Sequence, residues 1–374
     1  MKRLLLVLTF ILALAESAEA SSRRTDSLTV KIGQMLMIGF RGLDAKSEPR
    51  LEKDIRTRRI GGVVLFDYDV PSASTVRNIE SPDQVMRLVS KLQEMSSIPL
   101  FVAIDQEGGR ISRLKPARGF PKSLSAAHLG RLDNADSTRV AAAASASLLR
   151  RLKINMDLAP DVDLNVNPDN PVIGKLDRSF SGDHRIVTRH ARIFIEQFRA
   201  AGIIPVLKHF PGHGSSTTDT HRDFTDVTAT WSKNELEPYR ALIREGYDDP
   251  VMTAHVFNAR LDSLHPATLS KAIIGGMLRH DLGFRGVVVS DDMQMKAIAG
   301  LYGLEQAISL AIGAGADILL FGNNASTYEP EIAEKAAGII RKLVKQGVVT
   351  PRRIDESYRR IMDLKQRTLY HPPQ

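Results

Sequence analysis

Short apolar runs alternate with amphipathic helical patterns along almost the whole chain. The runs are rich in Leu and β-branched residues and are nearly continuous, which is typical of strands that are buried on both faces of a sheet. Such runs occupy residues 32–40, 62–66, 100–105, 156–164, 203–209, 251–256, 286–290 and 318–322.

Helical patterns lie between most of these predicted strands. The first of them begins after Ser81, with Pro82 at the first helical position and Gln84 where a capping box places Gln or Glu. Further helical patterns cover residues 137–152, 184–201, 233–245, 270–280, 304–313, 330–346 and 351–365.

This alternation predicts an α/β fold, a single (β/α)8 barrel of the TIM type. A doubly wound open sheet is the alternative, but it usually carries a glycine-rich phosphate loop after its first strand. The segment Gly39–Gly42 has too few glycines for that loop. Because no Gly/Ser-rich or Pro-rich linker interrupts the pattern, we expect one catalytic domain over residues 21–374.

The first twenty residues have the pattern of a signal peptide. Lys2 and Arg3 precede the apolar run Leu4–Leu14, and the small-residue site Ala18–Ala20 lies just before Ser21. The run is short for a membrane span, although an uncleaved N-terminal anchor is the alternative. The pattern therefore predicts a bacterial protein exported to the periplasm or secreted, with no membrane span after cleavage.

Composition narrows the class of protein further. The 374 residues are 43% hydrophobic and 25% charged, which excludes a mostly disordered chain, a collagen and a multi-pass membrane protein. The absence of Cys excludes disulfides, thiolate metal sites and a cysteine nucleophile. The net charge of +8 is compatible with acidic envelope polymers around an exported protein, and we expect no nucleic-acid partner.

Polar motifs recur where the predicted strands end. A single Asp after a strand usually caps a helix, but reactive groups of a barrel gather at the C-terminal ends of its strands. The motifs therefore predict one site. They are DQEGGR (Asp105–Arg110), Asp161 and Asp163, DRSF (Asp177–Phe180), KHFPGHG (Lys208–Gly214) with Asp219 and His221, His255, and SDDM (Ser290–Met293).

These motifs resemble those of glycoside hydrolase family 3, and within it the bacterial β-N-acetylglucosaminidase branch. The combination of KHFPGHG with Asp219-x-His221 is the most specific part, and the resemblance extends over about residues 32–365. It implies a cofactor-free, retaining exo-glycosidase. Such an enzyme removes terminal β-linked N-acetylglucosamine from oligosaccharides derived from peptidoglycan or chitin, through a covalent glycosyl-enzyme.

Glycoside cleavage needs a group opposite the leaving group and an acid on the leaving-group side. Asp291 and Asp292 end the seventh predicted strand, and adjacent strand residues face opposite ways, so we expect only one of them in the site. The resemblance implies that Asp291 is the nucleophile. It also implies that His221, which titrates near neutrality, is the acid and base, and that Asp219 orients it. By itself, Asp-x-His would more often be a solvated loop.

Other strand-end residues suit sugar hydroxyls. Asp105 can accept hydrogen bonds, Arg178 and Lys208 can donate them, and the resemblance adds His209 to this substrate-binding group. The roles of four further residues stay open or structural at this stage. Arg110 and Arg113 are either substrate ligands or surface ion-pair partners, His213 is expected to be structural, and His255 either lines the pocket or fills the barrel.

We expect no metal in the site. His209 and His213 are four residues apart, but Pro211 and Gly212 prevent the helix that would align them, and no H-x-H pair ends an early strand. Three rival functions remain: a β-glucosidase, a phosphate-dependent β-glycoside phosphorylase and a non-catalytic glycan-binding protein. A histidine acid would suit a phosphorylase because it avoids charge repulsion with phosphate.

Overall fold

A computed structural model describes residues 28–220 and 222–370. The predicted signal peptide and His221 lie outside the described residues. Within them, parallel strands form one sheet of order β13-β1-β2-β3-β6-β7 and a second of order β12-β10-β8. Their bounds are β1 Leu36–Gly39, β2 Gly62–Leu65, β3 Phe101–Ile104, β6 Met156–Asp157, β7 Ile204–Pro205, β8 Leu207–Phe210, β10 Val251–Thr253, β12 Val288–Val289 and β13 Leu319–Phe321.

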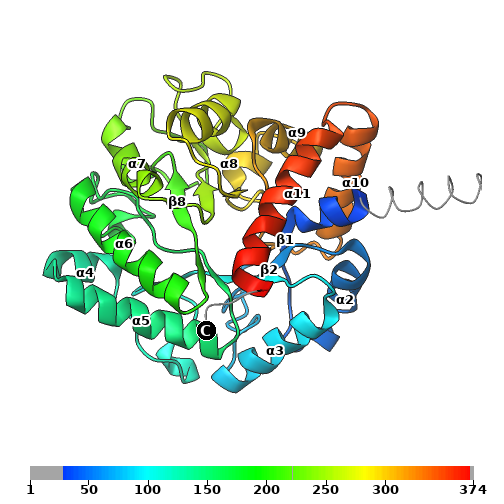
Figure 1. Cartoon of the computed structure of the whole chain (residues 1–374), viewed down its shortest axis with the longest axis horizontal. Helices are drawn as coiled ribbons and strands as arrows, with labels where there is room; N and C mark the ends of the chain where they lie inside the picture. The colour runs from blue at the N-terminus through cyan, green and yellow to red at the C-terminus, as the bar shows by residue number, and fades with distance from the viewer. Residues whose placement is uncertain (1–27, 221, 371–374) are drawn as a thin grey trace, which may run out of the picture.

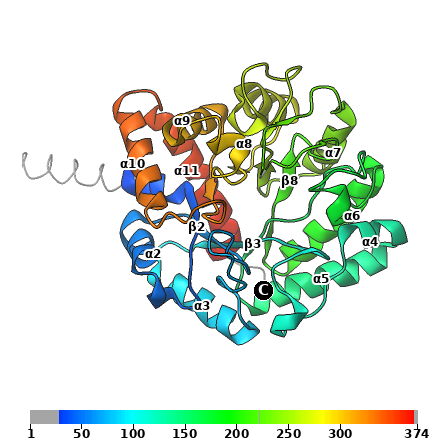
Figure 2. The same ribbon diagram turned by 180° about the vertical axis from the view of Figure 1, so that it is seen from behind.

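Two isolated parallel bridges connect these sheets, one between Val289 and Ile318 and the other between Asp161 and Lys208. Helices surround the strands in Figures 1 and 2, as the predicted (β/α)8 barrel requires. They are α2 Pro49–Lys53, α3 Pro82–Met95, α4 Ala126–Leu132, α5 Ala135–Arg151, α6 His184–Ala200, α7 Glu237–Arg244, α8 Lys296–Ala299, α9 Leu304–Ala314, α10 Ile332–Lys345 and α11 Pro351–Lys365.

Shorter elements complete the described chain. Two small strand pairs, β4 with β5 and β9 with β11, lie outside the main sheets. Their bounds, and those of the 3-10 and π-helical segments, are β4 Gln106–Gly108, β5 Ile111–Ser112, β9 Thr225–Asp226, β11 Val256–Phe257, η1 Ala45–Ser47, η2 Asp54–Arg58, η3 Pro116–Arg118, η4 Gly174–Leu176, η5 Lys233–Leu236, η6 Ala267–Leu269, η7 Ala272–Asp281 and η8 Gln366–Tyr370.

The barrel strands are apolar because they are covered on both faces. Every residue of β2 and β3 is buried, and the inner face of α6, which packs next to β7, buries Val187, Ala191 and Phe198. Each large apolar side chain buried in this way contributes about 1.5–3 kcal/mol relative to exposure. Continuous apolar runs in the sequence therefore identify the strands correctly.

Some predicted strands are shorter than their apolar runs. Residues 28–34 are helical, so the first strand begins at Leu36 instead of Ile32. The run 156–164 forms only the two-residue β6, because Pro160 has no N–H to donate to a neighbouring strand. Here the chain leaves the sheet early, and Asp161 and Asp163 lie in irregular backbone.

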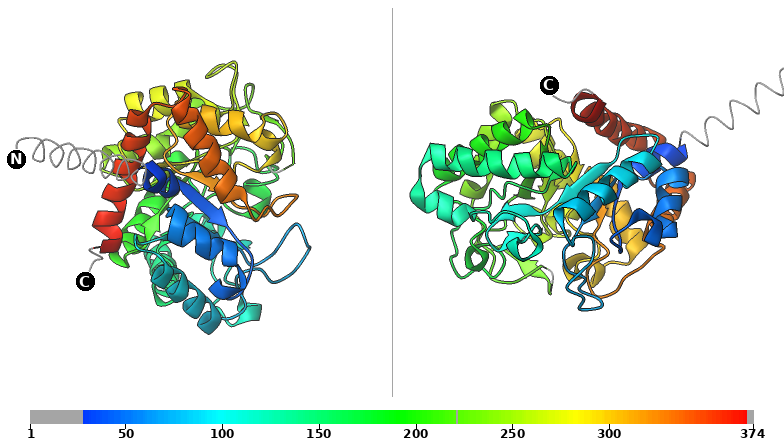
Figure 3. Two further views of the ribbon diagram at one scale, coloured as in Figure 1. Left: turned by 90° about the vertical axis from the view of Figure 1, so that its right-hand side faces the viewer. Right: turned by 90° about the horizontal axis from the view of Figure 1, so that it is seen from below.

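The loop after β2 is long, since β2 ends at Leu65 and α3 begins at Pro82. Figure 3 shows this blue loop projecting from one side of the molecule, whereas the red helix α11 lies on the other. The described helices include none that is both long enough and apolar enough to cross a membrane.

Candidate active site

A cavity of about 780 Å³ lies where the loops after the strands meet. This volume is within the range of small-molecule sites. The structure brings six of the seven predicted site residues into its lining, and the seventh, His221, lies outside the described residues. The six are Asp105, Arg178, Lys208, His209, Asp219 and Asp291.

A network of ion pairs forms one part of the lining. The Nζ atom of buried Lys208 lies 2.7 Å from Asp105 Oδ1 and 2.6 Å from Glu107 Oε1. Arg178 donates from Nε and Nη2 to the two carboxylate oxygens of Glu107, both at 2.8 Å. This bidentate geometry fixes the guanidinium plane as well as its charge.

Sequence reasoning missed Glu107. It lies in the DQEGGR motif, but its position depends on the β4–β5 hairpin, which no apolar run indicates. Gly108 ends β4 and Gly109 begins the turn of this hairpin, with φ values of 96° and 58°, where a side chain would be strained. The two consecutive glycines after Glu107 were the feature of the sequence that could have indicated this hairpin.

The network keeps its members ionised. Burial raises the pKa of Asp105, but the charges of Lys208 and Arg113 outweigh it and hold the pKa well below its usual value. Burial likewise opposes the charge on Lys208, yet Asp105 and Glu107 raise its pKa above the usual range. At neutral pH, Asp105 is therefore a hydrogen-bond acceptor and Lys208 a donor.

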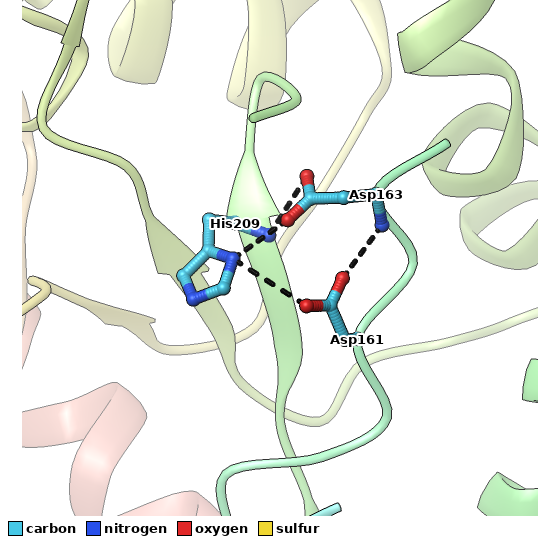
Figure 4. A group of neighbouring side chains, drawn as sticks. All are labelled: Asp161, Asp163 and His209. Carbon is cyan, nitrogen blue, oxygen red and sulfur yellow. Dashed lines mark hydrogen bonds and ion pairs between the residues drawn. The ribbon is translucent and has the colours of Figure 1, made fainter. Parts of the chain in front are cut away.

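His209 is oriented by a carboxylate behind it. Its Nδ1 lies 2.7 Å from Asp163 Oδ2 (Figure 4). Its Nε2 lies 3.3 Å from Arg178 Nη2. Asp163 also accepts from the backbone N–H of His213 at 2.7 Å. Burial raises the pKa of Asp163, but His209 and His213 lower it to about 2. The Asp163 carboxylate thus holds the Nδ1 proton and leaves Nε2 on the side of Arg178.

Asp161, Asp163 and His209 are also the one group of possible metal ligands within the described residues, with ligand atoms within 4.8 Å of one another (Figure 4). Protein groups already contact them. Asp161 accepts from the backbone N–H of Asp163 at 2.9 Å and lies 3.4 Å from Arg178 Nε. A guanidinium at this distance repels a second cation. The contacts favour support of His209 over metal binding, and a metal-free reaction stays a prediction.

Asp291 and Asp292 both line the cavity, so the expectation that only one of them faces it is wrong. Strand β12 ends at Val289, and the alternation of a strand does not extend to residues 291 and 292. The two carboxylates nevertheless differ. Asp292 Oδ1 accepts from the backbone N–H groups of Gln294 and Gly322, both at 3.0 Å, and so connects two loops. Asp291 Oδ1 accepts from the adjacent backbone N–H of Asp292 at 2.8 Å. Asp291 remains the candidate nucleophile.

The loop that leads to Asp219 is held by hydrogen bonds to Glu235. Glu235 Oε2 accepts from the backbone N–H groups of Gly214 at 3.0 Å and Ser215 at 3.3 Å. Burial raises the pKa of Glu235 to about 7. His213 lies 2.6 Å from Ser216 Oγ through Nδ1, which agrees with its expected structural role. Residues 212–216 of this segment are therefore buried and hydrogen-bonded.

The structure also shows where the residues lie whose roles the sequence left open. Arg113 lines the cavity and lies 3.2 Å from Asp105 through Nη2, so it belongs to the ion-pair network. Arg110 is exposed and lies outside the lining. His255 is fully buried, with Nδ1 2.9 Å from Thr268 Oγ1 and Nε2 2.9 Å from the carbonyl oxygen of Asp292. It supports the backbone next to Asp291 from inside the barrel.

Residues 27–364 match the glycosyl hydrolase family 3 N terminal domain, and the chain belongs to this family. Beta-hexosaminidase A of Pseudoalteromonas piscicida is 33% identical over 341 residues, which cover 81% of this chain and 55% of that protein. The chain therefore spans little more than half of that relative.

Solved structures agree with the family. A glycoside hydrolase family 3 β-N-acetylglucosaminidase from Paenibacillus sp. str. FPU-7 superposes with a TM-score of 0.82 at 36% identity, over 91% of this chain and 62% of that one. A β-N-acetylhexosaminidase from Beutenbergia cavernae DSM 12333 superposes with a TM-score of 0.80 at 28% identity, over 91% of this chain and 98% of that one.

Proposed function

We propose that this protein is a retaining exo-β-N-acetylglucosaminidase. One observation carries the proposal: Asp291 and Asp219 line the same cavity as the charged network of Asp105, Arg178 and Lys208. A carboxylate at a strand end, a loop with an Asp-x-His pair and a set of hydroxyl ligands are the parts that such a reaction needs. The hexosaminidase names of the relatives support the choice of sugar.

The proposed reaction has two steps. The Asp291 carboxylate forms a bond to the anomeric carbon while the bond to the aglycone oxygen breaks, and His221 gives its proton to that oxygen. The product of this step is a glycosyl ester on Asp291. Neutral His221 then takes a proton from water, the water oxygen displaces Asp291, and N-acetylglucosamine leaves with its configuration retained.

The ion-pair network would hold the terminal sugar for this reaction. The Asp105 carboxylate accepts hydrogen bonds from hydroxyls, and the Lys208 and Arg178 cations donate to sugar oxygens. Because these groups are already paired at 2.6–2.8 Å, little reorganisation is needed on binding. His209, held by Asp163, completes this set.

We also propose that the enzyme works outside the cytoplasm, in the periplasm or after secretion. This rests on the signal-peptide pattern of residues 1–20. The substrates would then be amino-sugar oligosaccharides from peptidoglycan or chitin. N-terminal sequencing of the native protein tests the proposal. It should begin at Ser21, and a retained Met1 would contradict export with cleavage.

An assay series on the purified protein tests the activity. Aryl β-N-acetylglucosaminide and aryl β-glucoside are compared, each with phosphate, without phosphate and after exhaustive chelation. We expect hydrolysis of the N-acetylglucosaminide that is independent of phosphate and survives chelation. Preference for the glucoside would indicate a β-glucosidase, sugar phosphate as product a phosphorylase, and no turnover of either substrate a glycan-binding protein. Activity lost on chelation and restored by zinc would indicate a metal site.

A further inference from the structure

The loop after β2 presents two apolar side chains to the cavity. Tyr68 is 39% exposed and Val70 is 51% exposed, and both belong to the lining that contains Asp291 and Asp219. A single exposed apolar side chain needs no explanation, but two that face the same concave site suit a ligand with an apolar surface. We name residues 67–78 the β2 arm.

The β2 arm is built around a buried ion pair. Arg77 and Asp69 are 2% and 4% exposed, and Arg77 Nη1 lies 2.5 Å from Asp69 Oδ1. Arg41 adds a second contact, with Nε 2.9 Å from Asp69 Oδ2. The backbone of Asp69 also pairs with that of Ser74, through N–H···O distances of 2.9 and 3.1 Å. These contacts hold the residue that lies between Tyr68 and Val70.

Asn324, in the loop after β13, fixes the backbone on both sides of Asp69. Its Nδ2 donates to the carbonyl oxygen of Tyr68 at 3.0 Å, and its Oδ1 accepts from the N–H of Val70 at 2.9 Å. Arg77 Nη1 donates to the same Oδ1 at 3.0 Å. The two apolar side chains therefore project from a rigid frame, so little entropy is lost when a ligand contacts them.

The β2 arm borders the charged network at one point. Asp67, at the base of the arm, lies 2.5 Å from Lys115 Nζ and 4.0 Å from Arg113 Nη1, and Arg113 contacts Asp105. Beyond Asp67 the lining contributed by the arm and by the loop after β13 changes from charged to apolar and neutral polar groups. These are Tyr68, Val70, Asn324, Ala325 and Ser326. This chemistry fits the C–H face of a sugar ring with hydroxyls at its edge.

We propose that Tyr68, Val70 and Asn324 form the subsite for the sugar ring on the leaving-group side of the scissile bond. The second N-acetylglucosamine of a β-linked oligosaccharide stacks on Tyr68, while the first sugar occupies the charged network. This inference rests on the proposed function and deepens it. The proposed subsite predicts that the β2 arm makes the protein prefer oligosaccharides over simple glycosides.

The test compares two substrates that share the first sugar. Chitobiose carries a second ring, and methyl β-N-acetylglucosaminide carries only a methyl group. We expect Tyr68→Ala to lower kcat/KM for chitobiose about 3- to 10-fold, mainly through KM, with no change for the methyl glycoside. Tyr68→Trp should restore the chitobiose value. Tyr370→Ala is the matched control, because Tyr370 is 42% exposed and lies outside the cavity lining.

A binding measurement separates this proposal from the proposed function. Protein carrying Asp291→Asn is titrated with N-acetylglucosamine and with chitobiose, with and without Tyr68→Ala. We expect Tyr68→Ala to weaken the binding of chitobiose alone. Equal weakening of both sugars, or of neither, would overturn the subsite whether or not the wild-type protein turns over substrate. Absence of turnover in the wild-type protein, with the chitobiose-specific loss intact, would overturn only the proposed reaction.

Discussion

Two lysines are completely enclosed in this barrel, and their surroundings differ. Lys208, at the end of β8 that faces the cavity, lies against two carboxylates, and its pKa is raised. Lys365, at the end of α11, donates to Gln34 Oε1 at 2.7 Å and to the carbonyl oxygen of Gly61 at 2.8 Å. Burial lowers the pKa of Lys365 well below its usual value.

The difference separates a functional face from a structural face. Gln34 and Gly61 precede the first two strands, so Lys365 closes the N-terminal end of the barrel as a hydrogen-bond donor whose burial disfavours its charge. Lys208 keeps its charge at the C-terminal end, where a TIM-type barrel places its chemistry. Burying a charged lysine is costly, and at Lys208 the two adjacent carboxylates offset that cost. Substitutions on the two faces should have separable consequences.

The largest effect should come from Asp291 on the functional face. We expect Asp291→Asn to lower kcat by about three to six orders of magnitude while thermal unfolding stays close to that of the wild type, since loss of a nucleophile has effects of this size. A mechanism-based fluorosugar followed by peptide mass spectrometry should place the ester on Asp291. A label on Asp292 would contradict the assignment.

His221 should show the next largest effect, and one that depends on the leaving group. A general acid contributes about 10² to 10⁴ in rate, so His221→Ala should lose most of this with chitobiose and much less with a nitrophenyl glycoside. Asp219→Asn should give a milder form of the same profile, because Asp219 only orients the histidine. Equal losses on both substrates would mean that His221 binds substrate and donates no proton.

The two lysines provide the direct test of the comparison. Lys208→Met should abolish activity and also destabilise the fold by about 3–5 kcal/mol, because it removes the cation that Asp105 and Glu107 share and leaves them with Arg113 and Arg178 alone. Lys365→Met should cost about 1–3 kcal/mol, because two buried acceptors lose a donor, and should leave kcat/KM unchanged. Urea unfolding and steady-state kinetics measure both. Loss of activity in folded Lys365→Met protein would contradict the division into a functional face and a structural face.

Glu235 gives a smaller effect that depends on pH. Its usual pKa is 4.5 and burial raises it to about 7, so the folded state holds the proton more tightly than the unfolded state. The stabilisation is complete below about pH 4.5 and is lost as the pH rises through 7, by up to about 3 kcal/mol. In Glu235→Gln protein, the unfolding free energy should not show this decrease between pH 5 and pH 8. Glu237→Gln is the control, because Glu237 is the first residue of α7, two positions after Glu235, and is partly exposed. This variant should retain the wild-type pH dependence.

The order of the strands and much of the site could be predicted from the sequence. Apolar runs identify a strand because burial on both faces imposes them, and Asp105, Lys208 and Asp291 lie at or just beyond the C-terminal ends of such runs. Strand length could not be predicted, since Pro160 ends β6 early while the apolar residues continue. An apolar run indicates that its residues are buried, but residues in the loops that cover a barrel are buried as well. The run therefore does not mark where the strand ends.

The parts of the site that escaped prediction are set by partners distant in the sequence. Glu107 becomes part of the network only when the β4–β5 hairpin brings it to Arg178, which is 71 residues away in the chain. Arg113 contacts Asp105 across the same hairpin. His255 contacts the backbone of Asp292 from a neighbouring strand, a position that periodicity within one strand cannot indicate.

The pairing of charges in the cavity has a consequence for selectivity. The whole chain carries a net charge of +8, which attracts acidic polymers to its surface. Inside the cavity, however, Lys208 and Arg178 are matched by Asp105 and Glu107, so their fields largely cancel. An anionic group that enters gains little attraction there and loses its hydration. We therefore expect acidic polymers to inhibit the proposed reaction only weakly, while uncharged sugars at chain ends still enter the cavity.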